Sequence, residues 1–388
     1  MNASGFVVSP GVRRGAWIVA ALGLAGLGAG LALEPTRALA SLLTSGFFFL
    51  CLGLGGAVFL ALMYVSNAGW ATVFKRIPEA FAAYVPVGAV TMLALLPGVS
   101  ALYLWARPGV MEQDPLLHTK QAFLNVPFFA VRMVVLLGLW SAFAWLLRRN
   151  SLRQDTERTP EQTGRNVTVS AIFLCLFALT FCLAAFDWLM SLEPHWFSTI
   201  FGLYNIAGLL SSSVCALTVA AILLRRSGAM PAINPSHLHD LGKLMFGFAT
   251  LWAYLWFSQY LLIWYSNLPE ETVYYVARTH GGWTVPFYAN LAINWALPFL
   301  LLLPRAAKRS EAHLLRVAGL LLVGRWLDLY LMVAPANLPE GAGVGVYEVA
   351  GFLGLGAVFV LAVTRAVQAA PLVPQGDPYL VESLHHHT

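Results

Sequence analysis

Charged side chains are scarce in this sequence. They make up 11% of its 388 residues, whereas a soluble domain carries about a quarter. Hydrophobic residues make up 59%, and apolar runs of about twenty residues recur along the whole chain. This composition excludes a soluble protein and indicates an all-α polytopic membrane protein. The net charge of +5 then reflects a bias of the loops toward lysine and arginine, and it does not indicate nucleic-acid binding.

Ligands for redox cofactors are also lacking. All nine histidines fall in loops or near the ends of apolar runs, whereas a haem b in a membrane normally needs two axial histidines inside helices. The four cysteines lie in apolar runs, without a Cys-x-x-Cys-His motif and without the spacing of iron–sulfur ligands. We therefore expect the chain to bind no haem, no cluster and no metal.

The apolar runs number ten, and each could cross about 30 Å of hydrocarbon at 1.5 Å per residue. They are residues 16–33, 41–64, 81–104, 126–147, 167–190, 197–224, 244–266, 285–303, 315–333 and 347–367. The first run follows Arg13 and Arg14 and precedes Ala38-Leu39-Ala40, a pattern that a signal peptide also has. We count it as a span, which gives one integral membrane domain over 1–388 with a tail at 368–388.

The lysine and arginine residues orient the ten spans. Sixteen of them fall on the side that holds both chain ends, and four fall on the opposite side: Arg37, Arg107, Lys120 and Arg278. Because positive residues concentrate in cytoplasmic loops, we expect both termini in the cytoplasm. Removal of the first span would place the sixteen outside, so this count supports ten spans.

The sequence also contains a weak internal repeat. Trp105, Glu112 and Val126-Pro127-Phe128 recur 159 residues later as Trp264, Glu271 and Val285-Pro286-Phe287. Asp187 and Pro194 recur 141 residues later as Asp328 and Pro335, and we attribute the change of offset to a longer loop at 148–166. Four spans per copy preserve orientation, so we predict two parallel four-helix units, 41–196 (spans two to five) and 197–335 (spans six to nine), with spans one and ten peripheral.

Ionisable residues inside the spans are the main candidates for function, because charge is costly in hydrocarbon. Each predicted unit carries one arginine and one aspartate in its outer half: Arg132 with Asp187, and Arg325 with Asp328. They could form a proton relay or a quinone-headgroup pocket, or they could be structural ion pairs. We favour function for Arg325 and Asp328, which share a helix face, and structure for Asp187. Polar neighbours expected at similar depth are Asn205, Gln259, Tyr260, Asn290 and Asn294.

Two connecting segments add weaker candidates for proton handling. Glu193 and His195 are expected to be exposed on the outer loop after span five. His237, His239 and Asp240 precede span seven on the cytoplasmic side, where Ser236 could cap the helix or the group could collect protons. His-x-His beside one aspartate is too weak a pattern to predict a metal site.

Four segments carry a family resemblance: NVPFFAVRM (125–133), FDWLMSLEPHWFSTIFGLYNIAG (186–208), SHLHDLGKLMFGF (236–248) and FSQYLLIWYSNLPEETVYYVAR (257–278). They resemble the ActF-type membrane subunit of bacterial alternative complex III, a quinol:electron-acceptor oxidoreductase. That subunit is similar to the NrfD and polysulfide-reductase anchor family. The resemblance extends over about the length of the chain and implies a ten-helix protein of the bacterial inner membrane.

The resemblance also implies partners. They are a sister NrfD-like subunit that oxidises quinol, an iron–sulfur subunit, subunits with haem c, and small membrane subunits; a terminal oxidase is left open. Quinol would be the substrate of the complex, and this chain would contribute a proton pathway and structural support without catalysing a reaction alone. Two alternatives stay open, a direct quinone-binding redox subunit and a secondary transporter.

Overall fold

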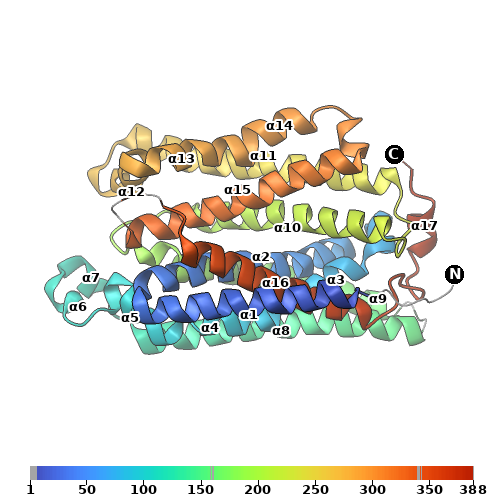
Figure 1. Ribbon diagram of the computed structural model, residues 1–388, viewed down its shortest axis with the longest axis horizontal. Coiled ribbons are helices and arrows are strands. Elements are labelled where there is room, and N and C mark those ends of the chain that lie inside the picture. Colours follow the sequence, from blue (N-terminus) through green and yellow to red (C-terminus); the bar gives the residue numbers. More distant parts are fainter. Residues whose placement is uncertain (1–6, 158, 160, 339–340, 342, 388) are drawn as a thin grey trace.

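The computed structural model describes residues 7–157, 159, 161–338, 341 and 343–387, and this part of the chain is helical without strands. Ten of its helices are long and apolar enough to span a membrane, as the sequence predicts. They run roughly along one axis, and both chain ends lie at the same end of the bundle (Figure 1). We call this the terminal end and the opposite one the distal end.

Seven spans are single helices and two are interrupted, while one ends in a short turn. The continuous ones are α1 (Pro10–Leu33), α2 (Pro35–Val65), α8 (Val126–Glu157), α10 (Phe201–Arg226), α11 (Pro235–Ser266), α15 (Glu311–Asn337) and α16 (Val346–Gln368). The fifth span consists of α9 (Glu161–Trp188) and a 3₁₀ turn at Met190–Leu192. The third is divided into α3 (Arg76–Ala82), α4 (Val85–Leu93), a 3₁₀ turn at Leu96–Gly98 and α5 (Val99–Leu102). The eighth comprises a 3₁₀ turn at Gly281–Trp283, α13 (Thr284–Leu291), a π-helical segment at Ala292–Ala296 and α14 (Leu297–Leu302).

Short helices occupy the connections and the C-terminal tail. They are α6 (Val110–Gln113), α7 (Pro115–Lys120), α12 (Pro269–Thr279), α17 (Leu380–Leu384) and 3₁₀ turns at Gly69–Phe74, Leu104–Ala106 and Ala307–Arg309.

The prediction of a loop at 148–166 is wrong for most of that range. Residues 148–157 continue α8 and residues 161–166 begin α9, while 158 and 160 lie outside the described residues. Arginine, glutamine and glutamate are good helix formers, so the helix continues where the apolar run stops. The connection between α1 and α2 is likewise shorter than expected, because Pro35 starts α2 directly after Glu34.

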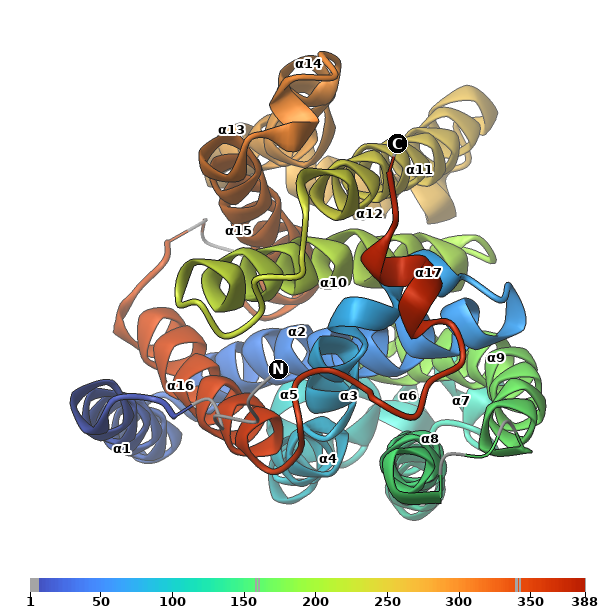
Figure 2. The same cartoon turned by 90° about the vertical axis from the view of Figure 1, so that its right-hand side faces the viewer.

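Helix α2 is the centre of the molecule (Figure 2). Of its most apolar stretch, 89% is buried inside the protein. The spans form two closed rings of helices. One consists of α2, α3–α4, α8 and α9, and the other consists of α10, α11, α13–α14 and α15. The rings meet where α2 packs on α10 and α15, and where α9 packs on α10. We call them the first and the second ring.

Helices α1 and α16 lie outside both rings. They form the most extensive helix pair in the described part of the chain, and α16 packs in turn on α2. Gly23 and Gly354 let the two backbones touch, since a Cβ at Gly23 would lie 2.3 Å from the Gly354 Cα. Small residues at such a crossing permit close packing in a membrane.

Candidate functional site

Asp328 of α15 is the centre of a buried polar cluster in the second ring. Its side chain is 1% exposed. It accepts hydrogen bonds from the Tyr204 hydroxyl of α10, from Trp252 Nε1 of α11 at 3.0 Å, and from Asn290 Nδ2 of α13 at 3.0 Å. Arg325, one turn earlier on α15, pairs with it at 2.5 Å. A carboxylate offers about four acceptor positions, so donors from all four helices of the ring fill Asp328 completely.

Arg325 is held in place from the opposite side. Its second terminal nitrogen donates to Asn205 Oδ1 of α10 at 2.9 Å. Its guanidinium group lies over Gly208, where a Cβ would come within 2.4 Å of the guanidinium carbon. The glycine on α10 therefore provides the space that a buried arginine needs between two packed helices.

The π-helical segment orients the amide of Asn290. Asn294, within that segment, donates to the Asn290 backbone oxygen at 3.0 Å and to Asn290 Oδ1 at 2.7 Å. Because Oδ1 accepts from Asn294, the Nδ2 of Asn290 must be the atom that faces Asp328. Pro298 follows the segment and has no N–H for the carbonyl of Asn294, which accounts for the locally widened helix. Such segments are frequent at functional sites.

Arg132 and Asp187 form a separate ion pair in the first ring. Arg132 Nε and NH2 bind the two carboxylate oxygens at 2.6 and 3.0 Å, and Asp187 is fully buried. The guanidinium group also donates to the Phe123 backbone oxygen at 3.0 Å and lies 3.9 Å from that ring and 4.3 Å from the Phe128 ring. This geometry fits the structural role that the sequence favours for Asp187.

Glu193 and His195 bind to different partners at the distal end. Glu193 is half-buried, not exposed as expected, and it pairs with Arg278 of α12 at 2.6 Å. Arg278 is buried, lies 3.4 Å from the Tyr274 ring and donates to the Leu331 backbone oxygen at 2.8 Å. At the level of sequence, Arg278 has no role beyond that of a loop charge.

His195 is exposed, and its Nε2 lies 2.6 Å from Asp114 Oδ2. This hydrogen bond, together with the backbone N–H of Leu117, lowers the pKa of the Asp114 carboxyl. The contact joins two connecting segments of the distal end.

His237, His239 and Asp240 lie in the first turns of α11 at the terminal end. The helix is capped by Asn234 and not by Ser236, because the Asn234 side chain accepts from the backbone N–H groups of Ser236 and His237. His237 Nδ1 accepts from the Asn234 backbone N–H at 3.1 Å, and its ring is buried. This completes a capping box.

Asp240 pairs with Lys243 at 2.5 Å and with His386 of the tail at 2.6 Å. His239 is buried. The group therefore caps a helix and holds the chain end.

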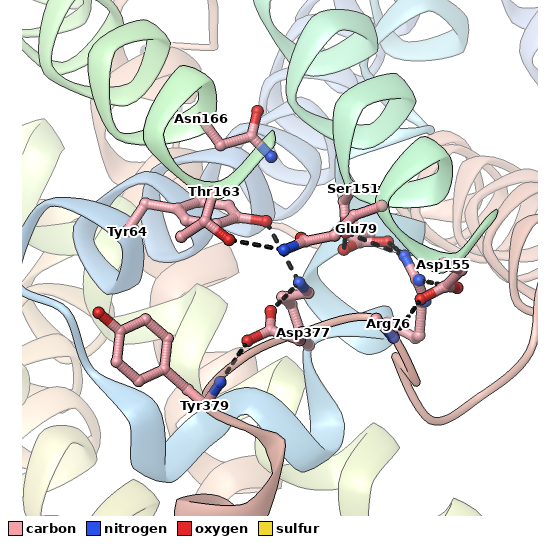
Figure 3. A network of polar contacts seen from close by, with 12 residues as sticks. Tyr64, Arg76, Glu79, Ser151, Asp155, Thr163, Asn166, Asp377 and Tyr379 are labelled. Carbon is pink, nitrogen blue, oxygen red and sulfur yellow. Dashed lines mark hydrogen bonds and ion pairs between the residues drawn. The ribbon is translucent and has the colours of Figure 1, made fainter. Parts of the chain in front are cut away.

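A polar network at the terminal end was missed at the sequence level (Figure 3). Lys75 pairs with Asp377 of the tail, and Arg76 pairs with Glu79 and with Asp155 of α8. Lys75, Arg76 and Glu79 are almost completely buried. Lys75 and Arg76 are two of the sixteen positive residues that orient the spans. Glu79, three residues after Arg76, was the available signal, since that spacing places both on one helix face.

No protein-family model matches this chain, and a search of curated proteins finds no match either. Among the described residues, no group of three or more histidine, cysteine, aspartate or glutamate side chains could hold a metal ion.

Proposed function

We propose that this chain is a proton-handling subunit of a quinol-oxidising complex in the bacterial inner membrane, of the alternative complex III type, with both termini in the cytoplasm. The observation that carries the proposal is Asp328, a buried carboxylate bound by donors from every helix of the second ring. The sequence resemblance supplies the kind of complex. Electron-carrying groups, haem c and iron–sulfur clusters, belong to partner subunits in this proposal.

The donor set of Asp328 suggests how a proton is taken up. Four hydrogen-bond donors face the two oxygens of its carboxylate. Trp252, Asn290 and Arg325 can only donate through the atoms that face it, whereas the hydroxyl of Tyr204 can donate and accept. Rotation of that hydroxyl frees one acceptor position on Oδ1 for a proton, while Asn290 still donates to Oδ1 and Trp252 and Arg325 to Oδ2. Oxidation of quinol in the sister subunit would drive this change.

Burial argues against a direct quinone role for the two aspartates. Asp187 and Asp328 are 0% and 1% exposed, and protein donors occupy their oxygens. A quinone headgroup would have to displace an ion pair to reach either. The proton role requires no such displacement.

The interrupted spans argue against a secondary transporter. Transporters with repeats usually have broken helices at corresponding positions of the two halves. Here the irregular spans are the third and the eighth. In the proposed repeat the third corresponds to the seventh, which is the continuous helix α11, so the interruptions do not match.

The parallel repeat is part of this proposal. Each ring closes through the same order of neighbouring spans. In each, the aspartate of the last span is bound by a residue near the start of the preceding one, Arg132 for Asp187 and Asn290 for Asp328. The second ring thus places a neutral amide where the first has an arginine, and it takes its arginine from the aspartate's own helix.

The decisive experiment is Asp328→Asn in the native complex, with quinol oxidation, proton release and assembly measured together. We expect the complex to assemble and to oxidise quinol, but to lose proton release or generation of a membrane potential. Tyr204→Phe removes only the hydroxyl and should slow proton release with assembly intact. Asp187→Asn is the matched control. It should weaken assembly without a specific effect on proton release.

Two outcomes would contradict the proposal. If Asp328→Asn prevents assembly while Tyr204→Phe leaves proton release unchanged, the cluster is a structural ion pair. If assembly, turnover and proton stoichiometry all stay normal in Asp328→Asn, the residue has neither role.

A further inference from the structure

A groove on the outside of the bundle lies between α3–α4 and the terminal half of α8. Its cavity volume is about 520 Å³. Small and apolar residues, Ala82, Pro86 and Ala144, line one part, and Arg148, Arg149 and Arg153 line the other. We call it the Arg149 groove.

The lining changes from apolar to basic along α8. Trp145, Arg149 and Arg153 follow one another at intervals of four residues and so share one face of the helix. Towards the distal end the exposed side chains of α8 are apolar, among them Val134 and Val135. Tryptophan is enriched at the level of lipid headgroups. The groove therefore passes from hydrocarbon depth to the membrane surface.

In the part of the chain that the structure describes, the arginines of the groove have no acidic partners. Arg148 donates to the Ala366 backbone oxygen at 2.8 Å, and Arg149 lies 4.6 Å from the Trp145 ring. Among the described residues, no carboxylate forms an ion pair with Arg148, Arg149 or Arg153. Arg76 nearby differs, because Glu79 and Asp155 compensate its charge. The groove is thus positively charged, and no described residue supplies a counter-ion to it.

The same arrangement recurs in a second groove at the terminal end, between α1 and α16. Its cavity volume is about 760 Å³, and it is lined by Arg13, Arg14, Arg365 and Trp17. It too lies at the terminal end, with the tryptophan one turn further into the membrane than the arginines. Two grooves of like chemistry at the same level fit a common ligand of the membrane surface.

We infer that the Arg149 groove binds an anionic phospholipid. The phosphate lies between Arg149 and Arg153, the glycerol region lies at Trp145, and an acyl chain follows the apolar face of α8. Basic pockets between membrane helices on the cytoplasmic side bind anionic headgroups in this way. The site does not involve Asp328; of the proposed function it uses only the orientation that places the terminal end in the cytoplasm.

The test uses the full chain purified in detergent and measures retained lipid by native mass spectrometry with dioleoyl phosphatidylglycerol. Arg149→Gln/Arg153→Gln should weaken binding at this site by about fivefold for each arginine and should retain one lipid molecule fewer. Arg165→Gln/Arg305→Gln is the matched control. It removes the same charge from exposed arginines at the same end, and it should bind lipid like the unaltered chain.

The possible results separate lipid from other ligands. Retention of dioleoyl phosphatidylcholine equal to that of phosphatidylglycerol would overturn the headgroup assignment. Displacement of the lipid by inorganic phosphate alone would assign the arginines to a free anion. An equal loss of bound lipid in the control variant would mean that lipid binding depends only on the net charge of the protein and not on this groove. Unchanged lipid binding with loss of a subunit from the native complex would make the groove a protein interface.

Discussion

Part of the polar cluster around Asp328 could be predicted from single residues of the sequence. The spacing of Arg325 and Asp328 predicted their pairing, and Asn205, Asn290 and Asn294 were expected at similar depth. Gln259 was expected there too, but it donates to Tyr275 instead. Nothing in the sequence indicates a polar role for Tyr204 or Trp252, because an aromatic residue in an apolar run usually signifies packing. Only the direction in which its hydroxyl or indole N–H points shows whether such a residue donates a hydrogen bond or only packs.

Gly208 is the residue whose substitution tests the tight packing of Arg325. In Gly208→Ala the new methyl group would lie within 2.4 Å of the guanidinium group. Arg325 must then move away from Asp328 and Asn205. We expect a destabilisation of about 1–3 kcal/mol, the usual cost of overpacking a core, measured as a lower Tm of the purified chain.

Gly319→Ala on α15 is the control for this substitution. No atom lies within 4 Å of a Cβ at that position, so the better helix propensity of alanine should leave stability unchanged or higher by about 0.5–1 kcal/mol. Equal Tm values for the two variants would refute the packing argument.

At the scale of elements, the apolar stretches located every span, but they did not locate the helix ends. Hydropathy reports where a chain meets hydrocarbon, and the polar extensions of α8 and α9 leave that layer while their backbone stays helical. The tail was predicted as a segment beyond the last span, and nothing in it indicated attachment. Asp377, Ser383 and His386 bind Lys75, Trp70 and Asp240 respectively. Such contacts join residues distant in sequence, so local patterns could not predict them.

Asp377→Asn should detach the tail. The substitution leaves Lys75 buried without its counter-charge, and breaking a buried pair by removing one partner costs about 3–5 kcal/mol. The measurement is the rate of limited proteolysis after α16, which we expect to rise. Lys75→Met/Asp377→Leu removes both charges and should restore protection. Slow cleavage of the single variant would mean that the tail is held without this pair.

The pH dependence of the tail contact has a definite sign. Burial lowers the pKa of Lys75, but Tyr64, Glu79 and Asp377 more than offset this and raise it overall. A group with a raised folded pKa contributes its full stabilisation below its ordinary pKa, here 10.5, and loses it as the pH rises through the folded value. Lys75 should therefore hold the tail at neutral pH and release it only in strong alkali.

For the whole molecule, the count of ten spans was predictable, because each span must carry its own apolar run. The arrangement of the rings was not, since lipid-facing and protein-facing surfaces are equally apolar and periodicity does not separate them. Helix α2 is buried on nearly all sides and α1 is exposed on most of its surface, yet their mean hydropathies are similar, 2.3 and 2.0.

An experimental structure of the complex tests the repeat. We expect the first ring to superpose on the second in the same orientation, with Val126 on Val285 and Asp187 on Asp328. Superposition only after inversion would reject a parallel repeat and would reopen the transporter alternative, since inverted repeats are common in that class.

The close pairing of α1 with α16 has a consequence for biosynthesis. Helix α1 enters the bilayer first, but its main contact surface belongs to the tenth span. Until that span is made, Gly23 faces lipid with no helix against its backbone. A nascent chain that stops early leaves this surface open, and membrane quality-control proteases could distinguish it from a chain that has reached α16.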